Sequence, residues 1–201
     1  MAGISFKQAV GSGDELLSFI ENALRLPPEL VRPGFISLRT DSLASGAATQ
    51  SDTERVNSDY HFIWESMTGH VEPINVGTPA SRIHESFVQI RESGRNWQIF
   101  DQKLSMSFLV DHWENTSALG GSHASASGLS GMSFKVPHVF RSGSDVTAEF
   151  TCNSGFGATA TTVEVLLVGT YVHRDLELVN MGALSADEIR NLAARARRGG
   201  R

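Results

Sequence analysis

Apolar residues recur at every second position in several stretches between residues 35 and 171, and this period favours strands over helices. The clearest stretch has Leu104, Met106, Phe108 and Val110 alternating with Ser105, Ser107 and Leu109. Because successive side chains of a strand point to opposite faces, such a stretch buries one face. We therefore expect Phe108 in the core, and its truncation to alanine to destabilise the domain severely.

Further strand candidates follow the same pattern along the chain. Prolines and glycines separate many of them, and Pro73 confines its own segment to a sheet edge. They span residues 35–38, 60–64, 71–76, 83–91, 97–100, 134–136, 139–140, 146–152 and 159–172. The sequence predicts a mainly β protein of about eight strands, built as a two-sheet sandwich of jelly-roll type, with a barrel as the alternative.

Helical signals occur only near the two ends of the sequence. The capping-box pattern S-x-x-E occurs at Ser12 and again at Ser185, each time before apolar residues at helical spacing. The first predicts a helix over 12–26, which two prolines end. The second predicts a helix with a basic tail over 185–201. Together these elements predict one β-rich domain over 1–201 with a short helix at each end.

Two stretches of small polar residues predict long loops, at 41–57 and 115–132. Loops of this length are uncommon in compact domains unless they have a function. Their Ala, Ser and Gly content suits either a mobile surface loop or close packing against a neighbouring subunit. In the second loop we take Ser122, His123 and Ser125 as candidate interface residues.

The charge pattern excludes a surface that is basic as a whole but leaves one basic segment. Lysine and arginine number 17 against 22 acidic residues, a net charge of −5. The exception is the C-terminal segment, whose arginines either complement the helix dipole or contact nucleic acid or an acidic neighbour. Its candidate interface residues are Arg190, Arg195, Arg197, Arg198 and Arg201.

Compartment signals are few. One cysteine, Cys152, excludes an intrachain disulfide and suits a reducing compartment, with the thiol in or near the core. The N-terminal residues lack the apolar centre of a secretion signal, and no apolar run is long enough to predict a membrane span.

Catalytic and metal-binding patterns are weak. The seven histidines include no H-x-H pair of the kind that metal-binding jelly rolls use. Asp111-His112 has no nucleophile motif to complete a triad, and the G-x-G-x-x-A pattern from Gly155 precedes a β-branched run rather than a helix, so it indicates a hairpin turn. We expect no metal, no cofactor and no enzymatic activity.

The stretch from Phe134 to Tyr171 resembles virion structural proteins of tailed bacteriophages. It reads FKVPHVFRSGSDVTAEFTCNSGFGATATTVEVLLVGTY, with a V-P-x-x-F turn, an S-G-S-D turn and a T-x-V-x-V-x-L-x-G-x-Y strand. These relatives are small β-rich proteins of the head-to-tail region or the particle surface. The resemblance implies a virion component that is made in the host cytoplasm and works as a symmetric ring or cluster.

From this resemblance we expect a neck, collar, connector or tail-associated protein, whose partners are copies of itself and neighbouring virion proteins. A capsid decoration protein is the first alternative. A carbohydrate-binding sandwich is the second, with aromatic platforms at Tyr60, Trp64, Trp97 and Trp113. Exposure separates these readings, because a sugar platform needs aromatic faces open to solvent.

Overall fold

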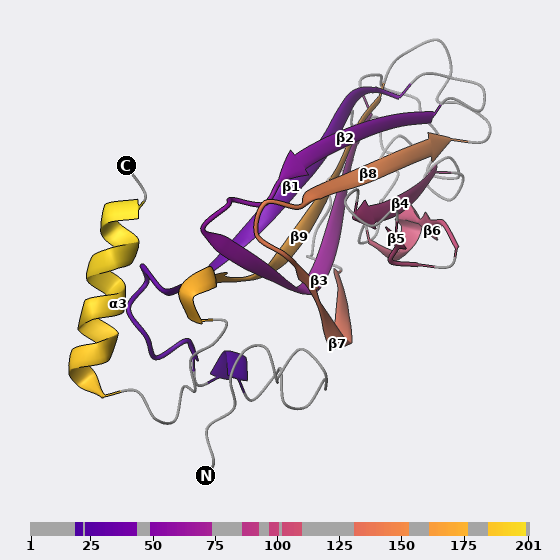
Figure 1. Cartoon of the computed structure of the whole chain (residues 1–201). Coiled ribbons are helices and arrows are strands. Elements are labelled where there is room, and N and C mark those ends of the chain that lie inside the picture. Colours follow the sequence, from indigo (N-terminus) through magenta and orange to yellow (C-terminus); the bar gives the residue numbers. More distant parts are fainter. Residues whose placement is uncertain are drawn as a thin grey trace, which may run out of the picture.

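Two antiparallel sheets form the body of the molecule (Figure 1). The computed structural model describes residues 19–21, 23–43, 49–73, 86–92, 97–100, 102–109, 131–152, 161–176 and 185–199. The strands are β1 (Val31–Leu43), β2 (Thr49–Arg55), β3 (Tyr60–Pro73), β4 (Ser86–Glu92), β5 (Trp97–Gln98), β6 (Leu104–Ser105), β7 (Gly131–Phe140), β8 (Asp145–Cys152) and β9 (Thr161–His173). The described chain also contains two 3₁₀ turns, η3 (Met106–Phe108) and η5 (Arg174–Leu176), and the helix α3 (Ala186–Gly199).

The strand order is that of a jelly roll. One sheet has the order β1-β9-β3-β7, and the other has β2-β8-β4-β5, with β6 also paired to β4. Strands therefore pair from the outside of the sequence inward, β1 with β9, β2 with β8, β3 with β7 and β4 with β6, as in a long hairpin folded over itself. The predicted sandwich is confirmed, and the barrel alternative is wrong because the strands are divided between two sheets.

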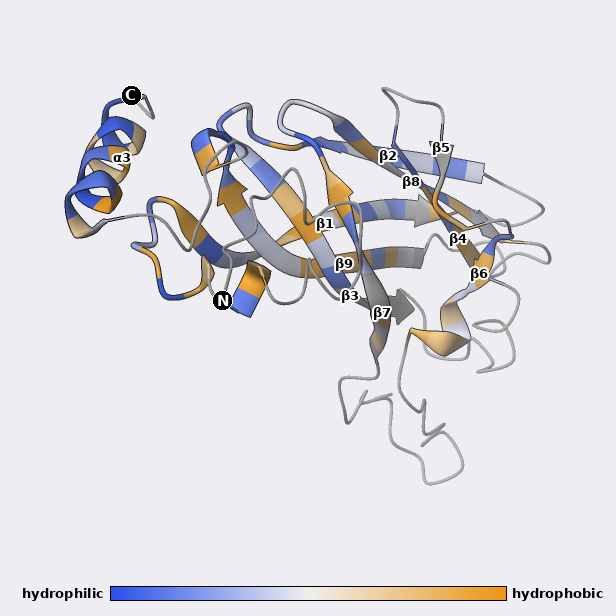
Figure 2. Ribbon diagram, turned by 60° about the horizontal axis from the view of Figure 1, so that its bottom comes forward, coloured by the Kyte–Doolittle hydropathy of each residue, from blue (hydrophilic) through white to orange (hydrophobic). Residues whose placement is uncertain are grey.

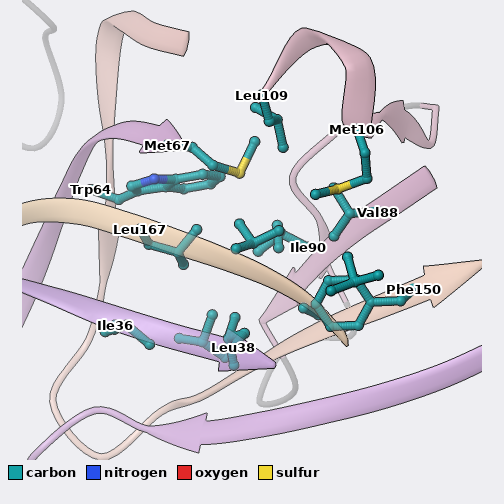
Figure 3. Packing of buried hydrophobic residues seen from close by; sticks show 14 of the residues in the cluster. Ile36, Leu38, Trp64, Met67, Val88, Ile90, Met106, Leu109, Phe150 and Leu167 are labelled. Carbon is teal, nitrogen blue, oxygen red and sulfur yellow. The ribbon is translucent and has the colours of Figure 1, made fainter. Parts of the chain in front are cut away.

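The core fills the space between the sheets, as the alternating pattern requires. Ile36 and Leu38 of β1 point inward, and so do Val163, Val165 and Leu167 of β9. Aromatic rings from β3, β7 and β8 enlarge the cluster, and Figure 3 shows several of these buried side chains close together. Its largest fully buried members include Trp64, Phe62, Phe140 and Phe150. Cys152 is free and fully buried in this core, which confirms its predicted placement.

The predicted strand over 104–110 is wrong in its second half. Only Leu104–Ser105 pairs as a strand, and a 3₁₀ turn follows, in which Ser105 Oγ accepts a hydrogen bond from the Ser107 amide at 3.3 Å. Residues three apart share a face of such a turn, so Met106 and Leu109 are buried while Phe108 is 67% exposed. The expectation that Phe108 lies in the core is therefore wrong.

The predicted loop over 41–57 is also wrong, because most of its described residues are strand. β1 continues to Leu43, and β2 occupies Thr49–Arg55. β2 is an edge strand whose side chains are mostly exposed, so its polar sequence carries no apolar alternation. Of the predicted loop over 115–132, residues 131 and 132 belong to β7, and the rest lies outside the described residues.

A second apolar cluster covers one end of the outer face of the first sheet. Ile63 of β3 and Val172 of β9 point out of the sandwich and meet Phe19, Ile20 and Ala23. Residues 19–21 and 23 are helical, and the helix predicted over 12–26 ends too late, because residues 24–26 form a turn and bend; residues 12–18 and 22 lie outside the described residues. Leu30, Val31, Leu176 and Ala193 complete the buried set. None of the described helices is long and apolar enough to span a membrane.

Candidate interaction surfaces

The start of α3 is fixed by the capping box that the sequence predicts. Ser185 Oγ accepts a hydrogen bond from the Glu188 amide at 3.3 Å, and Glu188 Oε2 accepts from the Ser185 amide at 2.8 Å. The Ser185 hydroxyl also donates to this carboxylate at 2.7 Å. The hydroxyl and amide of Ser185 hold the pKa of Glu188 below its ordinary value. The exposed helix thus begins at a defined residue.

The body of α3 is held by a narrow apolar stripe and one ion pair. Ala193 is buried in the second cluster, and Ile189, Leu192 and Ala196 pack against it. At the far end of the helix, Arg197 Nη2 lies 2.6 Å from Glu29 Oε1 and Nε donates to the same oxygen at 2.8 Å. The Glu29 backbone amide and then Arg197 lower the pKa of this carboxyl.

A basic hollow lies along the side of α3 next to this ion pair. It is lined by Pro27, Ala193 and Ala194 together with three arginines. These are Arg190, Arg197 and Arg198. Figure 2 shows α3 set to one side of the sandwich, so the hollow is distant from β4 and β6. The described residues that line the hollow include three arginines and no acidic residue.

The candidate interface arginines fall into three groups. Arg197 is engaged within its own chain, and Arg190 Nη1 lies 3.4 Å from Asp187 Oδ1 in an exposed pair. Arg195 and Arg198 are exposed, and within the described part of the chain neither forms an ion pair. Ser122, His123, Ser125 and Arg201 lie outside the described residues. Sequence reasoning missed Glu29, because 168 residues separate it from Arg197 and no local pattern joins them.

An apolar surface lies on the outer face of the first sheet. Phe35 of edge strand β1 is directly opposite Val168 of β9, and both point away from the core that Ile36 and Leu167 enter. Phe35 is 62% exposed and Val168 is 38% exposed. Large apolar side chains grouped on a sheet face are typical of protein contact sites. The sequence held a signal for this site, because Ile36 and Leu38 alternate and leave Phe35 on the opposite face.

A second exposed apolar side chain lies at the opposite edge of the sandwich. Phe108 follows β6, which pairs with β4 on the side away from β8 and β2. The edges β1 and β2, in contrast, lie together, because the Arg39 amide donates to Asp52 Oδ2 at 2.8 Å. Phe35 and Phe108 therefore mark the two opposite edges of the sandwich.

The outer face of the second sheet is polar and internally paired. Glu149 of β8 receives Arg91 Nη2 at 3.1 Å and Lys103 Nζ at 3.4 Å. Lys103 also donates to Thr151 at 2.7 Å. These contacts tie β4, β8 and Lys103 together, with two cations around one carboxylate.

Two of the described histidines accept backbone hydrogen bonds, and Trp64 is buried. His61 Nδ1 accepts from the Ser142 amide at 3.1 Å, and His173 Nδ1 accepts from the Asp175 amide at 3.2 Å. The described residues hold no group of three His, Cys, Asp or Glu placed to bind a metal. Trp64 is fully buried, so it is no sugar platform. Trp113, like His84, His112 and His123, lies outside the described residues.

Comparison with known proteins assigns no family. No family model and no curated protein matches the sequence. Among solved structures, the Drosophila NLP core is 12% identical, with 70% of this chain and 99% of that chain covered and a TM-score of 0.31. A chain of Sulfolobus Turreted Icosahedral Virus is 16% identical over 90% of this chain and 52% of that one, with a TM-score of 0.41.

A further likeness is to the capsid asymmetric unit of cyanophage Pam1. It is 10% identical and covers 71% of this chain and 84% of that chain, with a TM-score of 0.34. TM-scores below 0.5 at such identities define neither a family nor a function.

Proposed function

We propose that this chain is a structural subunit of a bacteriophage virion that acts through contacts with its neighbours rather than through catalysis. The jelly roll is a fold that capsid subunits use, although it also serves lectin domains and cupins. The resemblance to tailed-phage virion proteins falls on residues 134–171, which include most of β7, all of β8 and most of β9. It favours a subunit of the neck, collar, connector or tail.

The observation that carries this proposal is the pair of exposed apolar sites at opposite edges of the sandwich. A ring forms when one surface of a subunit binds a different surface of the next, and the rotation closes. Phe35 with Val168 supplies one such surface at the β1 edge, and Phe108 supplies another beside β6. Two different sites on opposite edges suit a ring better than a single two-fold dimer.

A capsid decoration protein remains the alternative within the same class. Such a protein would bind another protein's surface, so Phe35 and Phe108 would contact that surface rather than each other. The carbohydrate-binding alternative loses its support at Trp64, which is fully buried beside Phe134 and Phe140.

The mass of the purified chain in solution tests the proposal. Light scattering coupled to size-exclusion chromatography is expected to give, at high concentration, one defined multiple of 21.8 kDa. Labelling this chain with antibody on intact particles is expected to mark the head-to-tail region. A chain that stays monomeric at every concentration, and labels the whole capsid surface, would instead support the decoration protein.

A further inference from the structure

We infer that the basic hollow on α3 is a nucleic-acid backbone site, in which Arg190, Arg197 and Arg198 hold phosphate groups. The hollow has the required chemistry, with three guanidinium groups beside proline and alanine. Guanidinium groups bind phosphate oxygens through paired, charge-assisted hydrogen bonds. This inference does not depend on the proposed ring.

Charge is divided unequally between the helix and the rest of the chain. Residues 185–201 contain five of the 17 basic residues and two of the 22 acidic ones, so this segment carries +3 while the remainder carries −8. The two acidic residues are Asp187 and Glu188 in the first turn, and none follows them in the helix. The C-terminal half of α3 is therefore a local cationic surface on an acidic protein.

The spacing of the arginines matches a phosphate backbone. Arg190 and Arg198 are eight residues apart, which is about 12 Å along a helix. One DNA strand presents about three or four phosphates over that length. Arg197 contacts Glu29 through Nε and Nη2. Arg190 Nη1 lies 3.4 Å from Asp187 Oδ1, so a phosphate would join two existing ion pairs.

A second copy of this chain is the less favoured occupant, because several of its described carboxylates already have cations. Asp41 pairs with Arg39 at 2.6 Å, Asp145 with Arg55 at 3.9 Å and Asp59 with Arg174 at 3.9 Å. Glu149 is flanked by two cations. An acidic neighbour built like this one would have to break its own pairs, whereas phosphates release only mobile counterions.

The salt dependence of DNA binding tests the inference. The full-length chain is titrated into a fluorescein-labelled 20-base-pair duplex between 50 and 200 mM salt, and anisotropy is measured. Three phosphate contacts give a slope of log K against log salt of about −2.7, which is about a 40-fold loss of affinity over this range. The Arg190→Gln/Arg198→Gln variant keeps the ion pair of Arg197 and is expected to reduce the slope to about −0.9.

The matched control removes two arginines elsewhere. Arg39→Gln/Arg55→Gln takes the same charge from exposed residues of β1 and β2 and is expected to leave the slope unchanged. Circular dichroism checks that both variants keep their fold. Absence of binding at 50 mM salt, or an equal slope in both double variants, would overturn the inference. Equally tight binding of poly-glutamate, lost in the α3 variant, would reassign the hollow to an acidic protein.

Discussion

At the scale of single residues, Gly169 is the position where β9 tolerates no side chain. A Cβ atom there would lie 1.9 Å from the carbonyl oxygen of Ile63 in the neighbouring strand β3. This oxygen belongs to the backbone, so the two strands would have to separate. Gly169→Ala is expected to lower the free energy of unfolding by about 3 kcal/mol, at the upper end of overpacking effects, as measured by urea denaturation.

Gly143 provides the comparison for this prediction. It lies in the turn between β7 and β8 with φ +73, and a Cβ atom there would meet only Arg55 Nη2 at 3.9 Å. Gly143→Ala is expected to cost about 1–2 kcal/mol, because an L residue in the left-handed region is strained without a clash. A larger effect at Gly143 than at Gly169 would contradict the observed approach of β9 to β3.

Truncation of Phe150 is expected to destabilise the domain strongly, and truncation of Phe108 is expected to leave its stability almost unchanged. Phe150 is fully buried between the sheets, and Phe150→Ala should lower the free energy of unfolding by about 3–5 kcal/mol. Phe108 is 67% exposed, so Phe108→Ala should change it by no more than about 0.5 kcal/mol. Thermal melting of the two variants beside the parent chain measures both effects. Similar losses in both would place Phe108 in the core after all.

At the scale of elements, α3 is expected to be held less firmly against the body in acid. Glu29 has its pKa lowered from 4.5 in the folded chain, so its contribution to docking is complete above that value. The contribution is lost as the pH falls through the lowered pKa and the carboxyl becomes neutral. Hydrogen exchange of α3 amides, corrected for intrinsic rates, should therefore show less protection at pH 3 than at pH 7.

Replacing the Glu29 carboxylate by an uncharged amide isolates the role of this ion pair. Glu29→Gln should give weak protection of α3 at both pH values, apart from the smaller dependence that Glu188 contributes through the cap. Glu54→Gln, on the exposed edge strand β2, is the control and should behave like the parent chain. An unchanged pH profile in Glu29→Gln would mean that the apolar stripe alone holds α3.

The elements differ in how far the sequence predicts them. β8 and β9 were predictable because their alternating side chains fill the core, and α3 because its cap is local. β2 was not predictable, since an exposed edge strand needs no apolar face. The turn at Met106–Phe108 resembles a strand in the sequence because Met106 belongs to two apolar patterns. It is spaced by two from Leu104 and Phe108, as in a strand, and by three from Leu109, as in a 3₁₀ turn.

At the scale of the whole molecule, the sequence predicts the sandwich but not which residues meet across it. The arginines of α3 were visible as a basic tail. Their hollow depends on Pro27, and their anchor depends on Glu29, both of which are far away in the sequence. The opposite placement of Phe35 and Phe108 likewise follows from strand order, which pairs β1 with β9 and β6 with β4. Contacts of this range are set by topology, and no local pattern records them.

The final prediction separates a ring from a two-fold dimer by mixing two variants. If the Phe35 surface of one copy binds the Phe108 surface of the next, then Phe35→Ser and Phe108→Ser each remove one half of every contact, and each variant alone should be monomeric. A one-to-one mixture keeps a single intact contact, between Phe108 of the first variant and Phe35 of the second, and should form a dimer that cannot grow. Light scattering measures the three masses. In a two-fold contact centred on Phe35, both halves of the contact use the same surface. The Phe108→Ser variant would then dimerise by itself, and mixing it with Phe35→Ser would produce no additional dimer.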